Sequence, residues 1–199
     1  MSYTNADNQT LNQNRANYWL VVWENLSRNR LWQFLLVAAG SASSIVDPHA
    51  PLVGLAVVSG STLKRERAIA TAIVIWFVNQ LYGYTIRQYP QTFESFAWGL
   101  LMGAGTLAVC LVSTIRPRFS HKDWKGHLLW LGLALVSGYI LFQGSVILAI
   151  ELSGRHGLTE AILWRIFVKD ASWAIALSLV HRLIAWLSMP RKYSQTSRS

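Results

Sequence analysis

The chain is poor in charged residues and in cysteine. Only 14% of its 199 residues are charged, whereas a soluble domain usually carries about 25%. The one cysteine, Cys110, excludes a disulfide-framed secreted domain and a zinc-cysteine module. Hydrophobic residues make up 52% of the chain, which excludes an intrinsically disordered protein. The sequence therefore lacks the groups that keep a soluble surface hydrated, and apolar segments dominate its organisation.

Long apolar segments with little charge occur six times. A helix that crosses a bilayer needs roughly 20 apolar residues, and charged residues or proline bound each segment. The first two would merge if Asp47, Pro48 and Pro51 did not interrupt them. We therefore predict an all-α, polytopic bundle of six transmembrane helices, at Leu31–Val46, Ala50–Leu63, Ala68–Ile86, Phe93–Ile115, Leu128–Ile150 and Ala161–Leu187.

The basic residues fall mainly on one side of this topology. Lysine and arginine number 18 against 9 acidic residues, a balance that a nucleic-acid binder also shows. Here, however, only Arg87 and Arg155 face the side opposite the termini. Because basic loops stay in the cytoplasm, we predict an inner-membrane protein with both termini cytoplasmic and with no nucleic-acid partner. The residues on the cytoplasmic side are Arg15, Arg28, Arg30, Lys64, Arg65, Arg67, Arg116, Arg118, Lys122, Lys125, Arg182, Arg191, Lys192 and Arg198.

Two polar tails flank the predicted membrane domain. Residues 1–28 form an Asn-rich tail without a cleavable signal peptide, residues 29–190 hold the six helices, and residues 191–199 form a cytoplasmic tail. Apolar and aromatic residues repeat at helical spacing late in the first tail. They predict an amphipathic helix on the membrane interface, and a cytosolic extension of the first span is the alternative. These residues are Tyr18, Trp19, Val22, Trp23 and Leu26.

Charged residues within the last predicted span are the main indication of a binding site. Each charge near the centre of a bilayer costs roughly 2.5–3.5 kcal/mol on insertion scales. Arg165 and Lys169 are four positions apart and share a helix face, and Asp170 is displaced by one position. An ion-pair network that only locks the bundle is one interpretation. A cationic pocket that receives an anionic ligand is the other, and we favour it.

Other polar residues fall in the outer third of the predicted bundle, whereas its cytoplasmic half is aliphatic or small. This asymmetry indicates a pocket open to the outside, because a channel needs polar lining through its whole depth. Headgroup solvation explains any one of these residues, and their number together with the cations favours a site. The predicted substrate-binding residues are Arg165, Lys169, Asp170, Glu94, Trp98, Asn79, Gln80, Gln143 and Glu151.

No motif for enzymatic chemistry is present. The sequence has neither a His-Glu-x-x-His motif nor a nucleotide-binding glycine loop. A haem held by two histidines needs them within spans, and Cys110 is expected to be a packing residue. We therefore expect no enzyme, catalytic residue, cofactor or metal site. The histidines are predicted in loops, at His49, His121, His127 and His156, or near the cytoplasmic end of the last span, at His181.

Small residues on the first span predict a docking surface. Ala38 and Ala42 are four apart, and small residues at this spacing let helices approach closely. This face resembles the Ala-x-x-x-Ala surface by which S components of energy-coupling-factor (ECF) vitamin transporters dock on their transmembrane coupling protein. The segment 50–60, followed by Lys64-Arg65-Glu66-Arg67 and an apolar third span, is similar in layout to that family.

The resemblance implies a substrate-binding subunit for uptake of a vitamin-like micronutrient, with an ATPase pair as further partner because this chain has no ATP motif. In that family the site lies near the external face and is built by the last three helices. We expect Arg165 and Lys169 to neutralise an anionic ligand, Trp98 to stack on a ring, and Asn79, Gln80 and Gln143 to donate hydrogen bonds. Two alternatives stay open: a structural or assembly subunit of a larger membrane complex, and an intramembrane enzyme that acts on a lipid.

Overall fold

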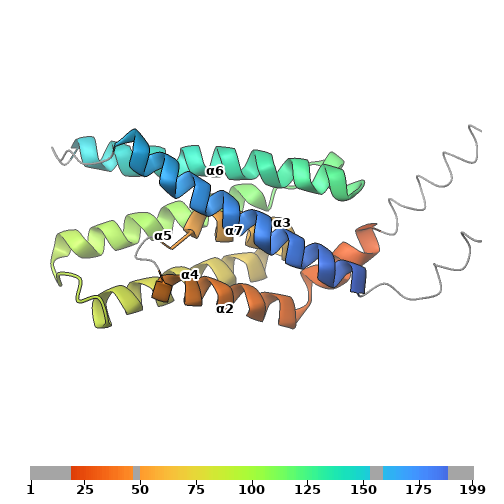
Figure 1. The fold of residues 1–199 in the computed structure, drawn as a ribbon, viewed down its shortest axis with the longest axis horizontal. Coiled ribbons are helices and arrows are strands. Elements are labelled where there is room, and N and C mark those ends of the chain that lie inside the picture. Colours follow the sequence, from red (N-terminus) through yellow and green to blue (C-terminus); the bar gives the residue numbers. More distant parts are fainter. Residues whose placement is uncertain (1–18, 47–49, 153–158, 188–199) are drawn as a thin grey trace, which may run out of the picture.

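The computed structural model describes residues 19–46, 50–152 and 159–187, which form a bundle of helices without a strand (Figure 1). A helical segment at residues 19–27 precedes the bundle. The helices that follow are α2 (Arg30–Val46), α3 (Leu52–Thr62), α4 (Arg65–Thr85), α5 (Phe93–Ser113), α6 (Trp124–Leu152) and α7 (Glu160–Leu187), with a 3₁₀ turn, η1 (Arg118–His121), between α5 and α6.

Each of the six predicted apolar segments coincides with one helix. The interruption after the first segment is confirmed, because α2 ends at Val46 and α3 begins at Leu52. By length and composition α4, α5 and α6 can each cross a membrane, which makes the chain an all-α protein of the helical membrane class. Helices α2 and α3 are shorter, with 17 and 11 residues, and the 28 residues of α7 include several charged side chains.

Helix α3, the shortest of α2 to α7, lies at the centre of the bundle. It packs against α2, α4, α5, α6 and α7, and all of its residues are buried. Eleven residues span about 16 Å, roughly half of the 30 Å hydrocarbon core of a bilayer. Glycine allows the closest approaches: a Cβ atom on Gly54 would lie 2.4 Å from the carbonyl oxygen of Asp170 on α7, and one on Gly60 would lie 2.5 Å from that of Cys110 on α5.

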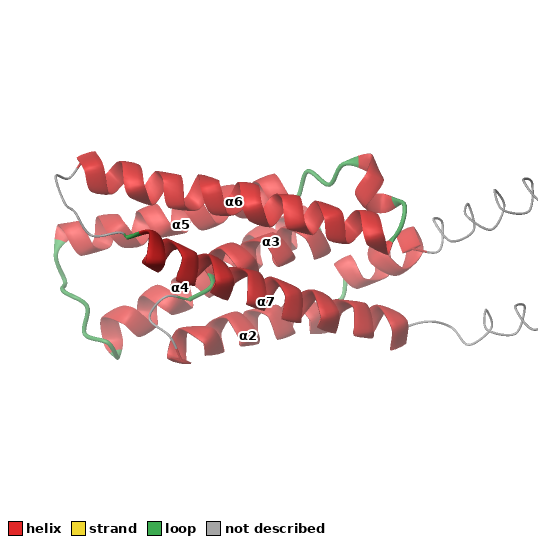
Figure 2. Ribbon diagram, turned by 45° about the horizontal axis from the view of Figure 1, so that its top comes forward, coloured by secondary structure: helices red, strands yellow, loops and turns green. Residues whose placement is uncertain are grey.

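The helices alternate in direction. The segment 19–27, the start of α2 and the C-terminal end of α7 lie at one end of the bundle, which we call the terminal end (Figures 1 and 2). Helix α3 begins in the middle of the bundle and runs back to the terminal end, so that α4 starts there as well (Figure 2). Consequently α2 and α4 run in the same direction, and the half of the bundle beyond the start of α3 contains no part of α3.

The surface of the bundle is rich in large apolar side chains. Phe77, Leu100 and Ile140 are each more than half exposed, on α4, α5 and α6 respectively. Monomeric soluble proteins rarely expose contiguous apolar areas of this kind, and such side chains suit a surface that faces lipid. The exposed side chains therefore agree with the membrane assignment of these three helices.

The segment 19–27 packs against the bundle. Val22 and Leu26 are buried against Ala185 of α7, so the apolar side of this helix faces protein at these positions. A turn at Arg28 and Asn29 separates it from α2, and the alternative prediction of a continuous extension of the first span is therefore wrong. Tyr18, the rest of the N-terminal tail and the C-terminal tail lie outside the described residues.

Candidate functional site

Asp170, on α7, satisfies the N-terminal end of α3. Its side chain is buried, with 2% of the residue exposed, and Oδ1 accepts a hydrogen bond of 2.8 Å from the backbone N–H of Gly54. The first N–H groups of a helix have no partner within it, and this end of a helix carries a partial positive charge. The carboxyl group of Asp170 is therefore engaged with α3, which gives it a structural role that neither interpretation of the sequence includes.

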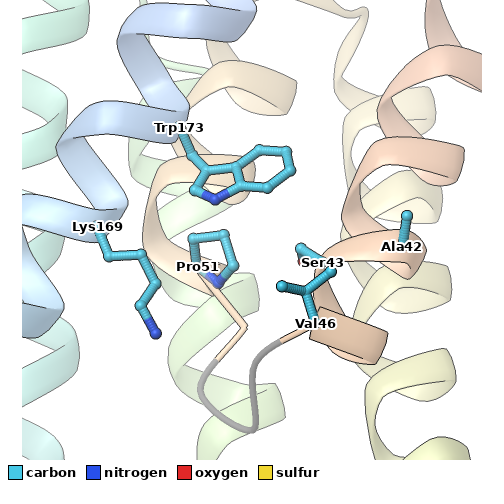
Figure 3. Close-up of a pocket in the computed structure, with 6 residues that line it drawn as sticks. All are labelled: Ala42, Ser43, Val46, Pro51, Lys169 and Trp173. Atoms are coloured by element: carbon cyan, nitrogen blue, oxygen red, sulfur yellow. The ribbon is translucent and has the colours of Figure 1, made fainter.

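A pocket of about 250 Å³ lies between α2, the start of α3 and α7 (Figure 3). Trp173 and Lys169 reach into it from α7, and Pro51 lies at the start of α3 (Figure 3). Small-molecule sites commonly measure about 300–1,000 Å³ and combine an apolar wall with a few polar groups. The pocket is smaller than this range, and its lining combines apolar side chains with one cationic group, Lys169. Its other lining residues are Ala42, Ser43 and Val46.

The predicted amides of α4, Asn79 and Gln80, do not line this pocket. The Nδ2 of Asn79 donates a hydrogen bond of 3.2 Å to the Oγ of Ser44, which follows the pocket residue Ser43. The Nε2 of Gln80 in turn donates to the Oδ1 of Asn79 at 3.3 Å. Asn79 therefore forms a polar contact between α4 and α2 next to the pocket, and Gln80 supports it from the same helix while its Oε1 lies against Gly99 of α5.

The remaining predicted site residues are distributed over three helices. Glu94 is exposed and Trp98 half-buried on α5, Gln143 is buried and Glu151 exposed on α6, and Arg165 is exposed on α7. None of the five lines the pocket of Figure 3. Of the predicted binding residues, the structure brings Lys169 and, through its contact with α3, Asp170 to this place. The predicted docking residues Ala38 and Ala42 are both exposed on α2, and Ala42 also lines the pocket.

Arg116 satisfies the opposite end of α3. It follows α5 with a backbone φ of 43°, which is uncommon for a residue with a side chain. Its guanidinium donates to the carbonyl oxygens of Gly60, at 3.2 Å, and of Leu63, and lies 4.2 Å from the ring centroid of Trp23. Burial lowers the pKa of Arg116 to about 10. The sequence predicts Arg116 only as a cytoplasmic loop charge, and no local pattern marks its contact with α3.

Aromatic and histidine rings gather at the terminal end. The rings of His127 and His181 lie 6.0 Å apart between centroids, and Trp32 lies 5.1 Å from His181. Both histidines are buried, and within the described part of the chain no hydrogen bond reaches Nε2 of His127 or either ring nitrogen of His181. The predicted loop position of His127 is wrong. Helix α6 begins at Trp124, four residues before the predicted apolar span at Leu128, and so includes His127.

The two histidines do not form a metal site with other side chains. Across residues 19–46, 50–152 and 159–187, no three His, Cys, Asp or Glu side chains come close enough together to hold a metal ion. Protein zinc sites use three or four such ligands, so the pair alone is insufficient for one. Trp19 and Trp124, whose centroids lie 5.4 Å apart, complete an aromatic wall around His127.

No family model, no curated protein and no solved structure matches this chain. The function is therefore inferred from the chemistry of its own residues.

Proposed function

We propose that this protein is an integral membrane substrate-binding subunit that captures a small, water-soluble, vitamin-like molecule with an anionic group. The observation that carries the proposal is the pocket of Figure 3, where Lys169 and Trp173 of α7 face α2 across the start of α3. A cation in this place offers a charge-assisted contact to a carboxylate or phosphate, and the indole and Val46 offer apolar area. The half-length of α3 leaves this part of the bundle open to such a ligand.

The proposal includes six membrane segments with both termini in the cytoplasm. Supporting it, both described ends of the chain lie at the terminal end of the bundle (Figure 1), and so do the basic residues at the start of α4 and in η1. With basic segments retained in the cytoplasm, the pocket falls in the outer half of the inner membrane. A nutrient then enters from outside without crossing the aliphatic half of the bundle.

Energy for transport comes, in this proposal, from a transmembrane coupling protein with an ATPase pair. The exposed positions of Ala38 and Ala42 on α2 favour a docking role for this face. Ala42 also lines the pocket, so a partner that binds α2 would contact one wall of the ligand site. Docking and ligand release are thereby linked through one helix.

The test is thermal unfolding of the purified full chain in detergent with a panel of water-soluble vitamins and small organic acids. A ligand at about 100 times its Kd adds about 2.7 kcal/mol of stability, which is roughly 5–10 °C in the unfolding midpoint. We expect one class of anionic compound to give this shift, and Lys169→Gln to abolish it. The matched control is Lys125→Gln, which removes the same charge from an exposed position at the terminal end. Absence of any shift across the panel would overturn the proposal.

A structural or assembly subunit of a larger membrane complex is the second candidate. The observation that favours it is the exposed small-residue face at Ala38 and Ala42, beside the exposed apolar side chains of Phe34 and Ile45 on the same helix. Affinity purification from native membranes separates the two candidates. Stable recovery within a respiratory or photosynthetic complex supports the assembly role, whereas recovery with an ATPase pair supports the transport role.

A further inference from the structure

A second hollow lies between α2 and α4 near the terminal end of the bundle. It is an open groove with a volume of about 530 Å³ and shares no residue with the pocket of Figure 3. Its lining consists of a polar part, with two arginines and an amide, and an apolar part with three side chains. The residues are Arg30, Gln33, Phe34 and Val37 of α2, and Arg67 and Val74 of α4.

The arginines of the two helices lie at the same end of the groove, and the valines lie at the other end. Helices α2 and α4 pack against each other and run in the same direction from the terminal end (Figures 1 and 2). Val37 follows Arg30 by seven positions and Val74 follows Arg67 by seven, so each valine lies on the same face as its arginine and about 10 Å further into the bundle. The groove is thus cationic at its terminal end and apolar toward the middle of the membrane.

The two arginines lie where a phosphate would meet them. Arg67 is half-buried and held in place, because its guanidinium donates to the backbone carbonyl oxygen of Arg28. Arg30 is exposed, and in the described part of the chain no carboxylate forms an ion pair with either arginine. Guanidinium groups match the geometry of phosphate oxygens and bind them in pairs of hydrogen bonds.

The apolar part of the groove is open to hydrocarbon. Phe34 is 65% and Val74 41% exposed, so an acyl chain lying along them would cover apolar area that no described residue covers. Gln33, one turn beyond Arg30, places an amide donor between the cationic end and this apolar wall. Headgroup, glycerol region and acyl chain therefore each have a matching set of side chains.

We infer that this groove binds one anionic phospholipid, with its phosphate between Arg30 and Arg67 and one acyl chain along Phe34, Val37 and Val74. The two arginines favour an anionic headgroup, because a zwitterionic headgroup would bring its own positive group close to them. A free phosphate uses the arginines alone and leaves the apolar wall uncovered. The inference is independent of the proposed function, since the groove and the pocket lie at opposite ends of α2.

The test is native mass spectrometry of the full chain after extraction from vesicles of equal parts phosphatidylglycerol and phosphatidylcholine. We expect one retained phosphatidylglycerol per chain. Each arginine that donates hydrogen bonds to the phosphate contributes about fivefold to retention of the lipid, so Arg30→Gln with Arg67→Gln lowers retention roughly thirtyfold. The matched control is Arg65→Gln with Arg118→Gln, which removes two exposed charges from the same end of the bundle outside the groove and leaves retention within about twofold.

Two further arms distinguish a bound phospholipid from a bound free phosphate. Val37→Ser with Val74→Ser keeps both arginines and lowers phosphatidylglycerol retention roughly fivefold, and millimolar inorganic phosphate does not displace the lipid. If the arginine pair does not fold, Arg30→Gln alone, at an exposed position, lowers retention roughly fivefold. Equal losses in the groove and control pairs, equal retention of phosphatidylcholine, or displacement by phosphate would each overturn the inference.

Discussion

The Oδ1 atom of Asp170 accepts a hydrogen bond from the backbone N–H of Gly54 at 2.8 Å and so joins the middle of α7 to the first turn of α3. At the other end of α3, the guanidinium of Arg116 donates to the carbonyl oxygens of Gly60 and Leu63. An acidic and a basic side chain thus meet the two ends of one buried helix, each at the end whose partial charge it complements. This arrangement allows an eleven-residue helix to stay in the centre of an apolar bundle.

We expect Asp170→Ala to destabilise the protein and Asp170→Asn to do so less. Alanine leaves the buried N–H of Gly54 without an acceptor, which costs about 1–3 kcal/mol, whereas asparagine keeps an oxygen in place. The unfolding midpoint in detergent should fall by roughly 2–12 °C in the alanine variant. Equal midpoints for the wild type and the alanine variant would contradict the role of this contact.

Arg116 offers a test that separates its side chain from its backbone conformation. Both Arg116→Ala and Arg116→Gly lose the bonds to α3, each worth about 1.5–3 kcal/mol for a charged donor. Glycine adopts the positive φ of this position without strain, so we expect the glycine variant to be the more stable of the two by about 0.5–1 kcal/mol. The measurement is the free energy of unfolding of the two variants, and a more stable alanine variant would contradict the strained conformation.

Gly54→Ala tests the close contact between α3 and α7. The added Cβ atom would lie 2.4 Å from the carbonyl oxygen of Asp170, so the helices have to move apart, at a cost of about 1–3 kcal/mol. Gly132→Ala on α6 is the matched control, because nothing lies within 4 Å of its Cβ position. Alanine there should be neutral or stabilising by up to about 1 kcal/mol. Similar unfolding midpoints for the two variants would argue against a tight α3–α7 contact.

Removal of the two cations in the first half of α7, Arg165 and Lys169, distinguishes a ligand site from a structural network. We expect Arg165→Gln with Lys169→Gln to abolish the ligand-induced rise in unfolding midpoint while the protein remains folded in detergent. The measurement is the midpoint with and without the anionic compound that stabilises the wild type. A double variant that no longer folds would support the ion-pair interpretation.

The attachment of the segment 19–27 should depend on pH through Glu24. Hydrogen bonds from Lys64 and Arg28 lower the pKa of Glu24, and its Oε1 lies 3.1 Å from the Nζ of Lys64. A lowered pKa means that the contact stabilises the fold above the ordinary carboxyl pKa of 4.5 and loses this effect as the pH falls through the lowered value. Amide hydrogen exchange in residues 19–27 should therefore be faster in Glu24→Gln than in the wild type at neutral pH. The two proteins should become alike in acid, and a difference that persists there would contradict this origin.

The positions of the helices were predictable, because a bilayer requires continuous apolar segments and charged or proline-containing turns separate them. The placement of α3 was not, since an apolar helix that is buried on all sides has no face that points to a neighbour. The contacts of Asp170 and Arg116 with the two ends of α3 could not be predicted from the sequence either. Asp170 lies 116 residues from Gly54, and Arg116 lies 53 residues from Leu63, so no local spacing relates them.

The candidate site was predictable only at Lys169, where a charge inside an apolar helix indicates a special environment. The pocket around it consists of Ala42, Ser43, Val46, Pro51 and Trp173, which are ordinary residues for a membrane segment. They come together because α3 starts in the middle of the bundle and leaves α2 and α7 apart beyond that point. The predicted polar residues of α5 and α6 lie at the same depth in the predicted membrane as this pocket. They do not line it, because the pocket is formed by α2, α7 and the start of α3.

The two end contacts of α3 also constrain the order in which the chain can mature. During synthesis α3 leaves the ribosome well before Arg116 and longer still before Asp170. Until α7 has entered the membrane, the first turn of α3 lacks its acceptor, and a chain that ends before α7 never acquires one. The centre of the molecule is consequently the last part to be completed, because the first turn of α3 gains its acceptor only when the final helix is in place.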